Sequence, residues 1–484
     1  MRKMIVGNIG ARFGAMLLRA GSRRRCIVAA VALALTACSV GPQYERPVIA
    51  APTAWRDAQA HAPAVWPATD WWRGFGSPQL DAYIAQAQRA NDDIAAAVAR
   101  VREADAQTRI AGSALLPAVA ASAGITHERT RAASGNLSTY SLYTPEISAA
   151  YELDFWGKNR AALRAAKATL AASRYDRATV ELTVVTGVAS TYFLALELRD
   201  RLSIAQNNLA SAEVILKGLK FEQTAGTANA LDVAQQETTV ATLDAAIPPL
   251  EQQLRQSVDA LAILLGKAPE AIDVASGGLL GLSQPRVQPG LPSELLARRP
   301  DVARAEAQLV AANANIALAR AAYFPNIQLT ASSGFASAAL SKVIDPANAV
   351  FSLAAGLTQP IFEGGALEAQ SAYARARYAE LLAAYHKTVI SAFADVEDAL
   401  VALQKTSDQL QRQQRAVATA RRAYEIAQAQ LHAGTINVLA LLNTESALFT
   451  AEDAMARVKL SHLQALIGLF NALGGGWQNT TPEA

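Results

Sequence analysis

Cysteine is nearly absent from this chain of 484 residues: its two cysteines, Cys26 and Cys38, both lie close to the N-terminus. The remainder therefore has neither a disulfide nor a cysteine metal site. The five histidines are scattered, and no two have the spacing that would place a metal pair on one helix. A glycine-rich phosphate loop and a Ser-His-Asp pattern are missing as well. These absences argue against an enzyme and against a bound metal or cofactor.

Long apolar runs are missing too. After Cys38 no segment approaches 18 continuous apolar residues, so we expect no membrane-spanning helix. The apolar run Cys26–Leu35 is shorter still and follows a basic cluster, Arg23–Arg25, which is the pattern of a signal peptide. Residues 1–37 are therefore predicted to be a targeting segment.

The targeting segment ends in a motif for lipid attachment. Leu35-Thr36-Ala37-Cys38 resembles a bacterial lipobox, whose cysteine receives S-diacylglycerol before cleavage and an N-acyl chain such as palmitate afterwards. The alternative is an ordinary secretory signal with a cysteine near its cleavage site. Ser39 follows Cys38, whereas Asp at that place usually retains a lipoprotein at the inner membrane. The sequence therefore predicts a lipid-anchored protein of the bacterial outer membrane.

The basic balance of the whole chain belongs to the targeting segment. The chain has 44 Lys and Arg against 41 Asp and Glu, and seven of the basic residues lie within residues 1–37. The rest carries 37 basic and 41 acidic side chains, a net charge of −4. That balance gives no electrostatic reason to bind nucleic acid.

One spacing of 208 residues relates the two halves of the chain. At this spacing Gly226-Thr227 corresponds to Gly434-Thr435, and Leu265-Gly266 corresponds to Leu473-Gly474. Further matching pairs are Asp93-Ile94 with Asp301-Val302, Leu116-Pro117 with Phe324-Pro325, Leu231 with Leu439, and Glu237 with Glu445. Chance does not reproduce glycine, proline and capping residues at one spacing over this length, so the sequence indicates gene duplication.

Each copy has the same predicted elements: a helix, an antiparallel hairpin, a very long helix and a shorter return helix. In the first copy, helical periodicity predicts one helix over residues 80–115, which Pro117 ends. Alternating side chains predict hairpins over about 118–155 and about 326–359. The uninterrupted helices predicted over 158–223 and 366–432 would each span about 100 Å, and the return helices follow over 231–265 and 439–473.

These elements suggest a division of the chain into six parts. It comprises a signal peptide (1–37), an N-terminal equatorial segment (38–79), a first repeat (80–266), an equatorial linker (267–292), a second repeat (293–474) and a C-terminal tail (475–484).

Four strands in one chain cannot close a barrel, and an open amphipathic sheet would leave its edge groups unsatisfied in lipid. We expect trimerisation, because three chains supply twelve strands and a lumen, whereas two supply eight strands around a filled interior. The apolar face would meet lipid and the polar face would line water, the polar residues being Glu146, Glu152, Asp154, Gln328 and Thr330. Aromatic residues at the strand–helix junctions are predicted to form an interfacial girdle, with ordinary junction packing as the alternative: Phe155, Trp156, Phe324 and Phe362.

Several segments resemble hallmarks of the outer-membrane factor family, the TolC-like channels. They are Tyr-Glu-Leu-Asp-Phe-Trp-Gly-Lys at 151–158, Leu-Pro-Ser-Glu-Leu-Leu-Ala-Arg-Arg-Pro-Asp-Val at 291–302 and Gln-Pro-Ile-Phe-Glu-Gly-Gly at 359–365. The lipobox and the closing Ala-Leu-Gly-Gly-Gly-Trp at 472–477 are similar to the lipoprotein branch, of NodT type, that serves resistance-nodulation-division multidrug pumps. The resemblance covers nearly all of the chain after the signal. It implies a homotrimer with a twelve-stranded transmembrane β-barrel, continued by a periplasmic α-helical barrel of long coiled-coil helices.

The resemblance also implies a function. Such a protein is the outer-membrane channel of a tripartite efflux system, which passively conducts drugs or other small molecules outward. Its implied partners are a periplasmic adaptor (a membrane fusion protein), an inner-membrane resistance-nodulation-division pump and the lipid of the outer membrane. The helix-turn tips, Gly226-Thr227 and Gly434-Thr435, would contact the adaptor or pump and open like an iris.

The residues that close the tips are not inherited from the family pattern. The two Asp that the family carries after its second Gly-Thr are replaced here by Ala440 and Asn443. A constriction formed by Asp232, Leu439 or Asn443 is therefore our hypothesis for the periplasmic gate. The alternative role for Asp232 is simply to cap its return helix.

Two other functions remain open from the sequence. One is a lipid-anchored periplasmic coiled-coil spacer, although a spacer has no use for strands with a lipid-facing side. The other is an exit duct for metal-cation or type I protein export, because the pump rather than the tunnel selects the cargo.

Overall fold

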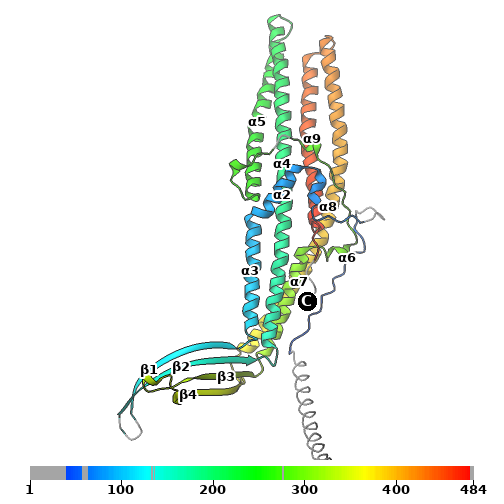
Figure 1. The fold of residues 1–484 in the computed structure, drawn as a ribbon. Helices are drawn as coiled ribbons and strands as arrows, with labels where there is room; N and C mark the ends of the chain where they lie inside the picture. The colour runs from blue at the N-terminus through cyan, green and yellow to red at the C-terminus, as the bar shows by residue number, and fades with distance from the viewer. Residues whose placement is uncertain (1–39, 57–63, 132–134, 136, 275–276, 480–484) are drawn as a thin grey trace, which may run out of the picture. The chain divides into compact units, whose positions relative to one another are not determined.

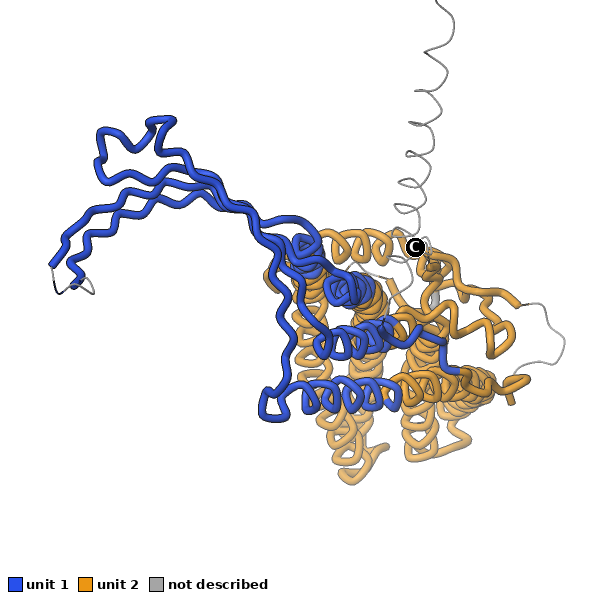
Figure 2. The backbone as a smooth tube through the Cα atoms, turned by 90° about the horizontal axis from the view of Figure 1, so that it is seen from below, with its two compact units in different colours: residues 1–47, 103–171, 307–383 blue, residues 48–102, 172–306, 384–484 orange. Residues whose placement is uncertain are grey.

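The computed structural model describes residues 40–56, 64–131, 135, 137–274 and 277–479. The predicted signal peptide and the predicted lipidation site Cys38 lie outside this range. The chain forms two compact units (Figure 2): unit 1 comprises residues 1–47, 103–171 and 307–383, and unit 2 comprises residues 48–102, 172–306 and 384–484. Both halves of the sequence contribute to each unit.

Helices and strands follow one another in the same order in the two halves of the chain (Figure 1). The first half contains α2 (Pro78–Ala90), α3 (Asp92–Ser113), β1 (Ala118–Arg131), β2 (Leu137–Leu153), α4 (Lys158–Thr224) and α5 (Ala230–Leu264). The second half contains α6 (Pro292–Leu295), α7 (Pro300–Ala321), β3 (Asn326–Phe335), β4 (Ala349–Thr358), α8 (Ala366–His432) and α9 (Val438–Ala472). Short 3₁₀ turns are Trp71–Phe75, Pro269–Ala271, Leu279–Gly281, Leu340–Lys342 and Pro346–Asn348.

The bounds of the helices repeat at the spacing found in the sequence. The long helices α4 and α8 have 67 residues each, and the return helices α5 and α9 have 35 residues each. The start and end of every one of these helices, and of α3 and α7, are displaced by 208 positions between the copies. The duplication is thereby confirmed at the level of backbone structure.

The prediction of one helix over residues 80–115 was wrong, because the chain leaves the helical conformation at Asn91. Its backbone is extended, with φ −70° and ψ 130°, which ends α2. The Asn91 side chain accepts a hydrogen bond from the backbone N–H of Ile94 at 3.1 Å and so begins α3. It also donates to the carbonyl oxygen of Leu264 at 2.9 Å, where α5 ends. One asparagine therefore interrupts the helix in order to join three helix ends.

The hydrophobic core of unit 2 is built from both copies of the repeat. Phe75, Leu80 and Phe193 from the first half and Leu463 from the second are each 0% exposed and belong to one buried cluster. The rings of Trp71 and Phe470 stack across the two halves with centroids 4.6 Å apart. Each such side chain contributes about 1.5–3 kcal/mol of burial free energy, so the core binds the two copies into one unit.

Among the described helices, α4 has a stretch apolar enough in length and composition to cross a membrane. Half of that stretch is buried inside the protein. Val184, Val185 and Val188 of α4 belong to the core of unit 2. We therefore interpret the apolar stretch as the buried side of a core helix.

Candidate channel wall and gate

The sheet of unit 1 has one apolar and one polar face. Its strands run antiparallel in the order β1-β2-β3-β4, so β2 pairs with β3 and joins the two repeats. Opposite residues in an antiparallel pair point to the same face. Tyr151 lies opposite Leu329, and Ala331 opposite Leu353, whereas Glu152 lies opposite Gln328 on the other face. The register therefore keeps the predicted apolar set together and separates it from the polar set.

The apolar face has no cover from the described part of the chain. The exposed fractions are 67% for Val119, 59% for Ile147, 86% for Phe351 and 80% for Leu353. The outer strands β1 and β4 each pair with one neighbour only, so each has an open edge. Exposed apolar surface and open strand edges are unfavourable in water, and both would be satisfied in a closed barrel within lipid.

Asp154 does not line the polar face, which corrects the sequence prediction. β2 ends at Leu153, and the Asp154 carboxylate accepts hydrogen bonds from the backbone N–H groups of Asn159 and Arg160 at 2.8 and 2.9 Å. The Arg160 guanidinium adds an ion pair at 3.0 Å, and the Asp154 side chain is only 7% exposed. A carboxylate in this place satisfies the free N–H groups at the start of α4 and interacts favourably with the helix dipole.

Three of the four junction aromatics pack together within unit 1. Trp156 stacks on Phe324 with ring centroids 4.7 Å apart and meets Phe155 edge to face at 4.8 Å. The Trp156 indole donates to the carbonyl oxygen of Pro325 at 2.9 Å. Phe362, by contrast, is 88% exposed. The cluster joins the end of β2 to the start of β3, and the girdle stays a prediction.

The two helix-turn tips have the same backbone geometry. At the first tip the N–H of Thr227 donates to the carbonyl of Glu222, and that of Gly226 to the carbonyl of Gln223. At the second tip the N–H of Thr435 donates to the carbonyl of Gln430 at 2.9 Å. These bonds form the Schellman arrangement that ends a helix on a left-handed residue. Gly226 and Gly434 supply it, with φ +79° and +69°.

The candidate gate residues lie on the first turns of the return helices. Asp232 forms a capping box with Asn229: its N–H donates to the Asn229 side chain at 2.9 Å, and its carboxylate accepts from the Asn229 N–H at 3.5 Å. The capping alternative for Asp232 is therefore present in the structure. Leu439 is 43% exposed and Asn443 is exposed, so both are free for contacts beyond their own hairpin.

Sequence reasoning missed a difference between the two hairpins. Glu237 on α5 pairs with Lys220 on α4 at 2.7 Å, and both side chains are about half exposed. Its counterpart Glu445 on α9 is 0% exposed. Burial raises the pKa of Glu445 from 4.5 to about 7. The sequence does contain one sign of this difference: Gln428 stands at the position that corresponds to Lys220, so Glu445 has no lysine to pair with there.

An ionic network links α4 of the first repeat to α9 of the second. Arg201 pairs with Asp453 at 2.6 Å and with Glu197 at 3.5 Å, and Arg457 pairs with Asp453 at 2.7 Å. Burial raises the pKa of Glu197, which is 2% exposed, and the charge of Arg201 opposes that rise. The network ties the two hairpins together well away from the tips.

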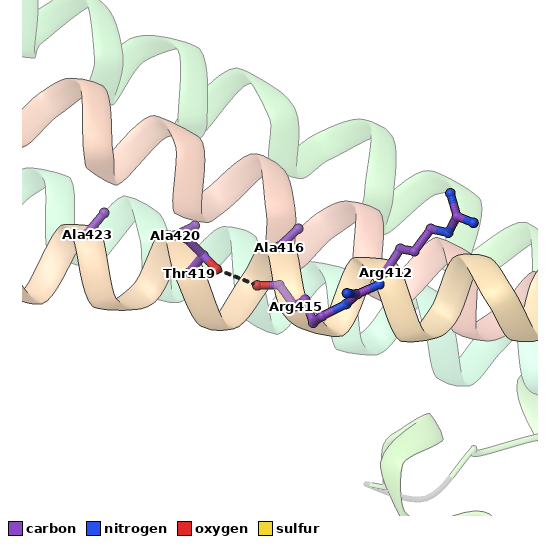
Figure 3. A pocket seen from close by; sticks show the side chains of 6 residues that line it. All are labelled: Arg412, Arg415, Ala416, Thr419, Ala420 and Ala423. Carbon is purple, nitrogen blue, oxygen red and sulfur yellow. Dashed lines mark hydrogen bonds between the residues drawn. The ribbon is translucent and has the colours of Figure 1, made fainter.

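α8 carries a largely exposed strip of small side chains with two arginines at one end (Figure 3). It forms a shallow groove of about 520 Å³ lined by Arg412, Arg415, Ala416, Thr419, Ala420 and Ala423. The Thr419 hydroxyl is turned back onto the carbonyl of Arg415 at 2.9 Å, which leaves the strip without a hydroxyl donor. Small side chains of this kind let another helix approach closely.

Comparison with known proteins identifies the family to which this architecture belongs. The family model described as "Outer membrane efflux protein" matches twice, over residues 83–267 and 291–475. The chain is 41% identical over 456 residues to the pyoverdine export outer membrane protein OpmQ of Pseudomonas aeruginosa, across 92% of this chain and 96% of that protein. It is 32% identical over 467 residues to the toluene efflux pump outer membrane protein TtgF of Pseudomonas putida, across 94% and 97% of the two chains. The solved structure of the outer-membrane channel OprN matches with a TM-score of 0.86 at 26% identity, over 91% of this chain and 100% of that chain.

The fold and its sheet define a channel protein of the outer membrane. The chain belongs to the outer membrane efflux protein family, whose function is transport. The resemblance inferred from the sequence, the duplicated fold and the efflux function are thereby confirmed. Within the described residues no group of three or more His, Cys, Asp or Glu side chains has the arrangement of a metal site.

Proposed function

We propose that three copies of this chain close one twelve-stranded barrel and conduct small molecules outward, passed to them by a periplasmic adaptor and an inner-membrane pump. The observation that carries the proposal is the sheet, whose apolar face and two open edges have no partner within the described part of the protomer. Pairing β1 of one copy with β4 of the next removes both edges at once. A coiled-coil spacer would gain nothing from such a sheet.

The proposed cargo is a small organic molecule. The relative with 41% identity is named for pyoverdine export and the one with 32% identity for toluene efflux. A metal-cation or protein cargo is the second candidate, and the described residues offer no clustered acidic or histidine site that favours it. The helix-turn tips, Gly226-Thr227 and Gly434-Thr435, are the proposed contacts for the adaptor or pump. The threonine N–H and hydroxyl groups donate to carbonyls of the preceding helix, so each turn is held in one conformation and presents a compact, exposed surface.

The proposed anchor is lipid on Cys38. S-diacylglycerol and an N-acyl chain exceed the two signals that stable membrane attachment requires. The chain that follows Cys38 packs on α7 within unit 1: the Asn313 side chain donates to the carbonyl of Pro42 at 3.1 Å, and Gly41 lies against Ala317. Intact mass spectrometry of the mature protein tests this anchor: its mass should exceed that of residues 38–484 by three acyl chains and the glycerol that carries two of them, and a mature chain without this added mass would contradict the proposal.

The proposed gate is a ring of side chains contributed by the tips, with Asp232, Leu439 and Asn443 as its members. All three lie within the first two turns of a return helix, and each would be present three times in the trimer. Opening would separate the tips in the manner of an iris. The strip of small side chains on α8 is the proposed contact for a neighbouring helix of the tunnel wall.

A transport assay tests the proposed function as a whole. The chain would be expressed with a matching adaptor and pump in a strain that lacks its own outer-membrane efflux channels, and retention of a fluorescent pump substrate would be measured. We expect wild type to lower retention and Leu353→Arg, which puts a charge on the apolar face, to fail. Equal retention with and without wild type, despite an assembled trimer, would contradict the proposal.

A further inference from the structure

The carboxylate of Glu445 is buried in α9 without a hydrogen-bond partner. Its side chain is 0% exposed, and both of its oxygens lack a donor in the described part of the chain. Leu441, Leu442 and Leu448 lie one turn before or after it, and all three are buried. Residues three and four apart share a helix face, so Glu445 lies in an apolar strip. An ionised carboxylate is one of the most costly groups to leave in such a place.

The corresponding group in the first repeat is solvated and paired. The Glu237 carboxylate is about half exposed and lies 2.7 Å from the ammonium of Lys220. In the second repeat Gln428 replaces that lysine, so the cation is missing from the matching position. The first hairpin has a second bridge between its helices, because buried Gln236 of α5 donates to the carbonyl of Ala212 of α4 at 2.8 Å. Two copies of one unit thus hold the same carboxyl group in opposite environments.

Among the described residues, no charged side chain acts on Glu445 as a counter-ion. Burial is the cause that raises its pKa to about 7. On α8 the titratable group that faces it is Tyr424, whose pKa is raised by burial and by the charge of Glu445. The charged groups of α8 next to Tyr424 are exposed or paired elsewhere: Arg422 and Glu425 are exposed, and Arg421 pairs with Glu452 of α9. On the corresponding turns of α5, which also contacts α9, Glu237 and Asp244 are exposed and Asp232 caps its own helix.

We propose that Glu445 is a proton-binding site that couples closure of the α8–α9 hairpin to pH, being neutral when the hairpin is packed and ionised when it opens. The proposal rests on the channel function proposed above. Loss of the proton leaves a charge inside an apolar strip, and only hydration or a cation can relieve it. Water reaches that carboxylate when α8 and α9 separate, so deprotonation favours the open tip.

The direction of the pH effect follows from linkage. The packed hairpin binds a proton more tightly than a hydrated carboxyl group does, so its stability is fully present below about pH 4.5, falls as pH rises, and has been lost once pH passes about 7. Because one pH unit is a factor of ten in proton activity, the opening equilibrium should rise about tenfold per pH unit for each hairpin between about pH 5 and pH 7. It should level off above that range.

Single-channel recording from the purified trimer in planar lipid bilayers tests the site. We expect the open probability of wild type to rise between about pH 5 and pH 7 and to level off up to pH 8, and that of Glu445→Gln to stay at the low-pH level throughout, because the amide cannot ionise. Glu237→Gln is the matched control, since the same change at the exposed counterpart should keep the wild-type pH profile. An unchanged pH profile in Glu445→Gln, or a flat profile in wild type, would overturn the proton site.

Infrared difference spectroscopy keeps the test decisive if Glu445→Gln does not assemble. Wild type and Glu237→Gln should both show a protonated carboxyl band that disappears as pH rises through about 7, and absence of that band would overturn the proposal. A trimer that conducts with no dependence on pH contradicts this inference alone. A trimer that never conducts contradicts the channel function instead.

Discussion

Arg299 donates a hydrogen bond to the carbonyl oxygen of Ala472 at 3.2 Å, which repeats in the second half of the chain the bond from Asn91 to Leu264 in the first. Both the donors and the acceptors are 208 residues apart. Each pair joins the end of a return helix, α5 or α9, to the start of the earlier helix of the same repeat, α3 or α7. Arg299 has additional partners, Asp301 at 2.7 Å and Asp395 at 2.9 Å. The duplicated joint therefore uses an amide in one copy and a buried guanidinium in the other.

Arg299→Met should destabilise the protein by about 2–3 kcal/mol, because it leaves the partly buried carboxylate of Asp301 and a helix-end carbonyl without their donor. Asn91→Ala removes two neutral hydrogen bonds and should cost less, about 1–2 kcal/mol. Chemical denaturation of the purified protein in detergent measures both changes. Equal losses for the two variants would show that the charge at the second joint adds nothing.

The same joint should make stability depend on acid. Burial alone would raise the pKa of Asp301, but hydrogen bonds and the charge of Arg299 hold that pKa below its ordinary value of 3.8. Its contribution is therefore complete above pH 3.8 and is lost as pH falls through the lowered pKa. Melting temperatures taken from pH 6 to pH 2 should show a loss in wild type that Arg299→Met lacks.

Leu353→Arg should prevent stable insertion of the barrel. Leu353 is 80% exposed on the apolar face of β4, and an arginine facing lipid costs about 2–4 kcal/mol near the bilayer midplane. Ser352→Arg is the matched control, since Ser352 is the next residue of the same strand and points to the polar face. Heat-modifiable trimer on a gel is the readout. If both variants assemble equally, the faces have been assigned wrongly.

Asp232→Ala should raise the resting conductance of the trimer and lower its preference for cations, because rings of acidic side chains narrow a pore and attract cations. Asn229→Ala separates this role from capping. It breaks the same capping box, at a cost of about 1 kcal/mol, and keeps the carboxylate. Planar bilayer recordings of the two variants decide whether Asp232 acts at the gate or only caps its helix. A purely capping Asp232 would give the same behaviour in both.

Gly434→Ala and Gly218→Ala should change stability in opposite directions. Gly434 has φ +69° at the second tip, so a Cβ atom there costs about 1–2 kcal/mol although the surrounding space is open. Gly218 lies inside α4, where alanine is the better helix former by about 0.5–1 kcal/mol. Hydrogen exchange at the helix ends next to each site measures the local effect. A stabilising Gly434→Ala would refute the strained turn.

The sequence predicted best what depends on local pattern over long stretches. α8 has the predicted bounds, and the tips lie at the predicted Gly-Thr pairs. Both depend on residues close together in the sequence, the first on helical periodicity and the second on a glycine that can take a positive φ. The break at Asn91 was not visible, since it depends on a carbonyl 173 residues away. The return helix predicted over 231–265 is present as α5, although it contains Pro248 and Pro249, two residues that favour ending a helix.

The candidate site was predicted in part for the same reason. The faces of the sheet follow from alternation, but Asp154 was assigned to the wrong role because its hydrogen bonds come from the helix that follows. The burial of Glu445 depends on how α8 packs against α9, and no periodic pattern distinguishes it from Glu237. Charged groups at helix contacts are the residues that pattern reasoning places least well.

Conductance of the purified, lipid-reconstituted protein, measured on material whose mass corresponds to three chains, tests the central claim most directly. The account predicts stepwise single-channel currents from the trimer and none from Leu353→Arg. A stable trimer with no conductance from pH 5 to pH 8, or a protein that remains a single chain in lipid, would contradict it.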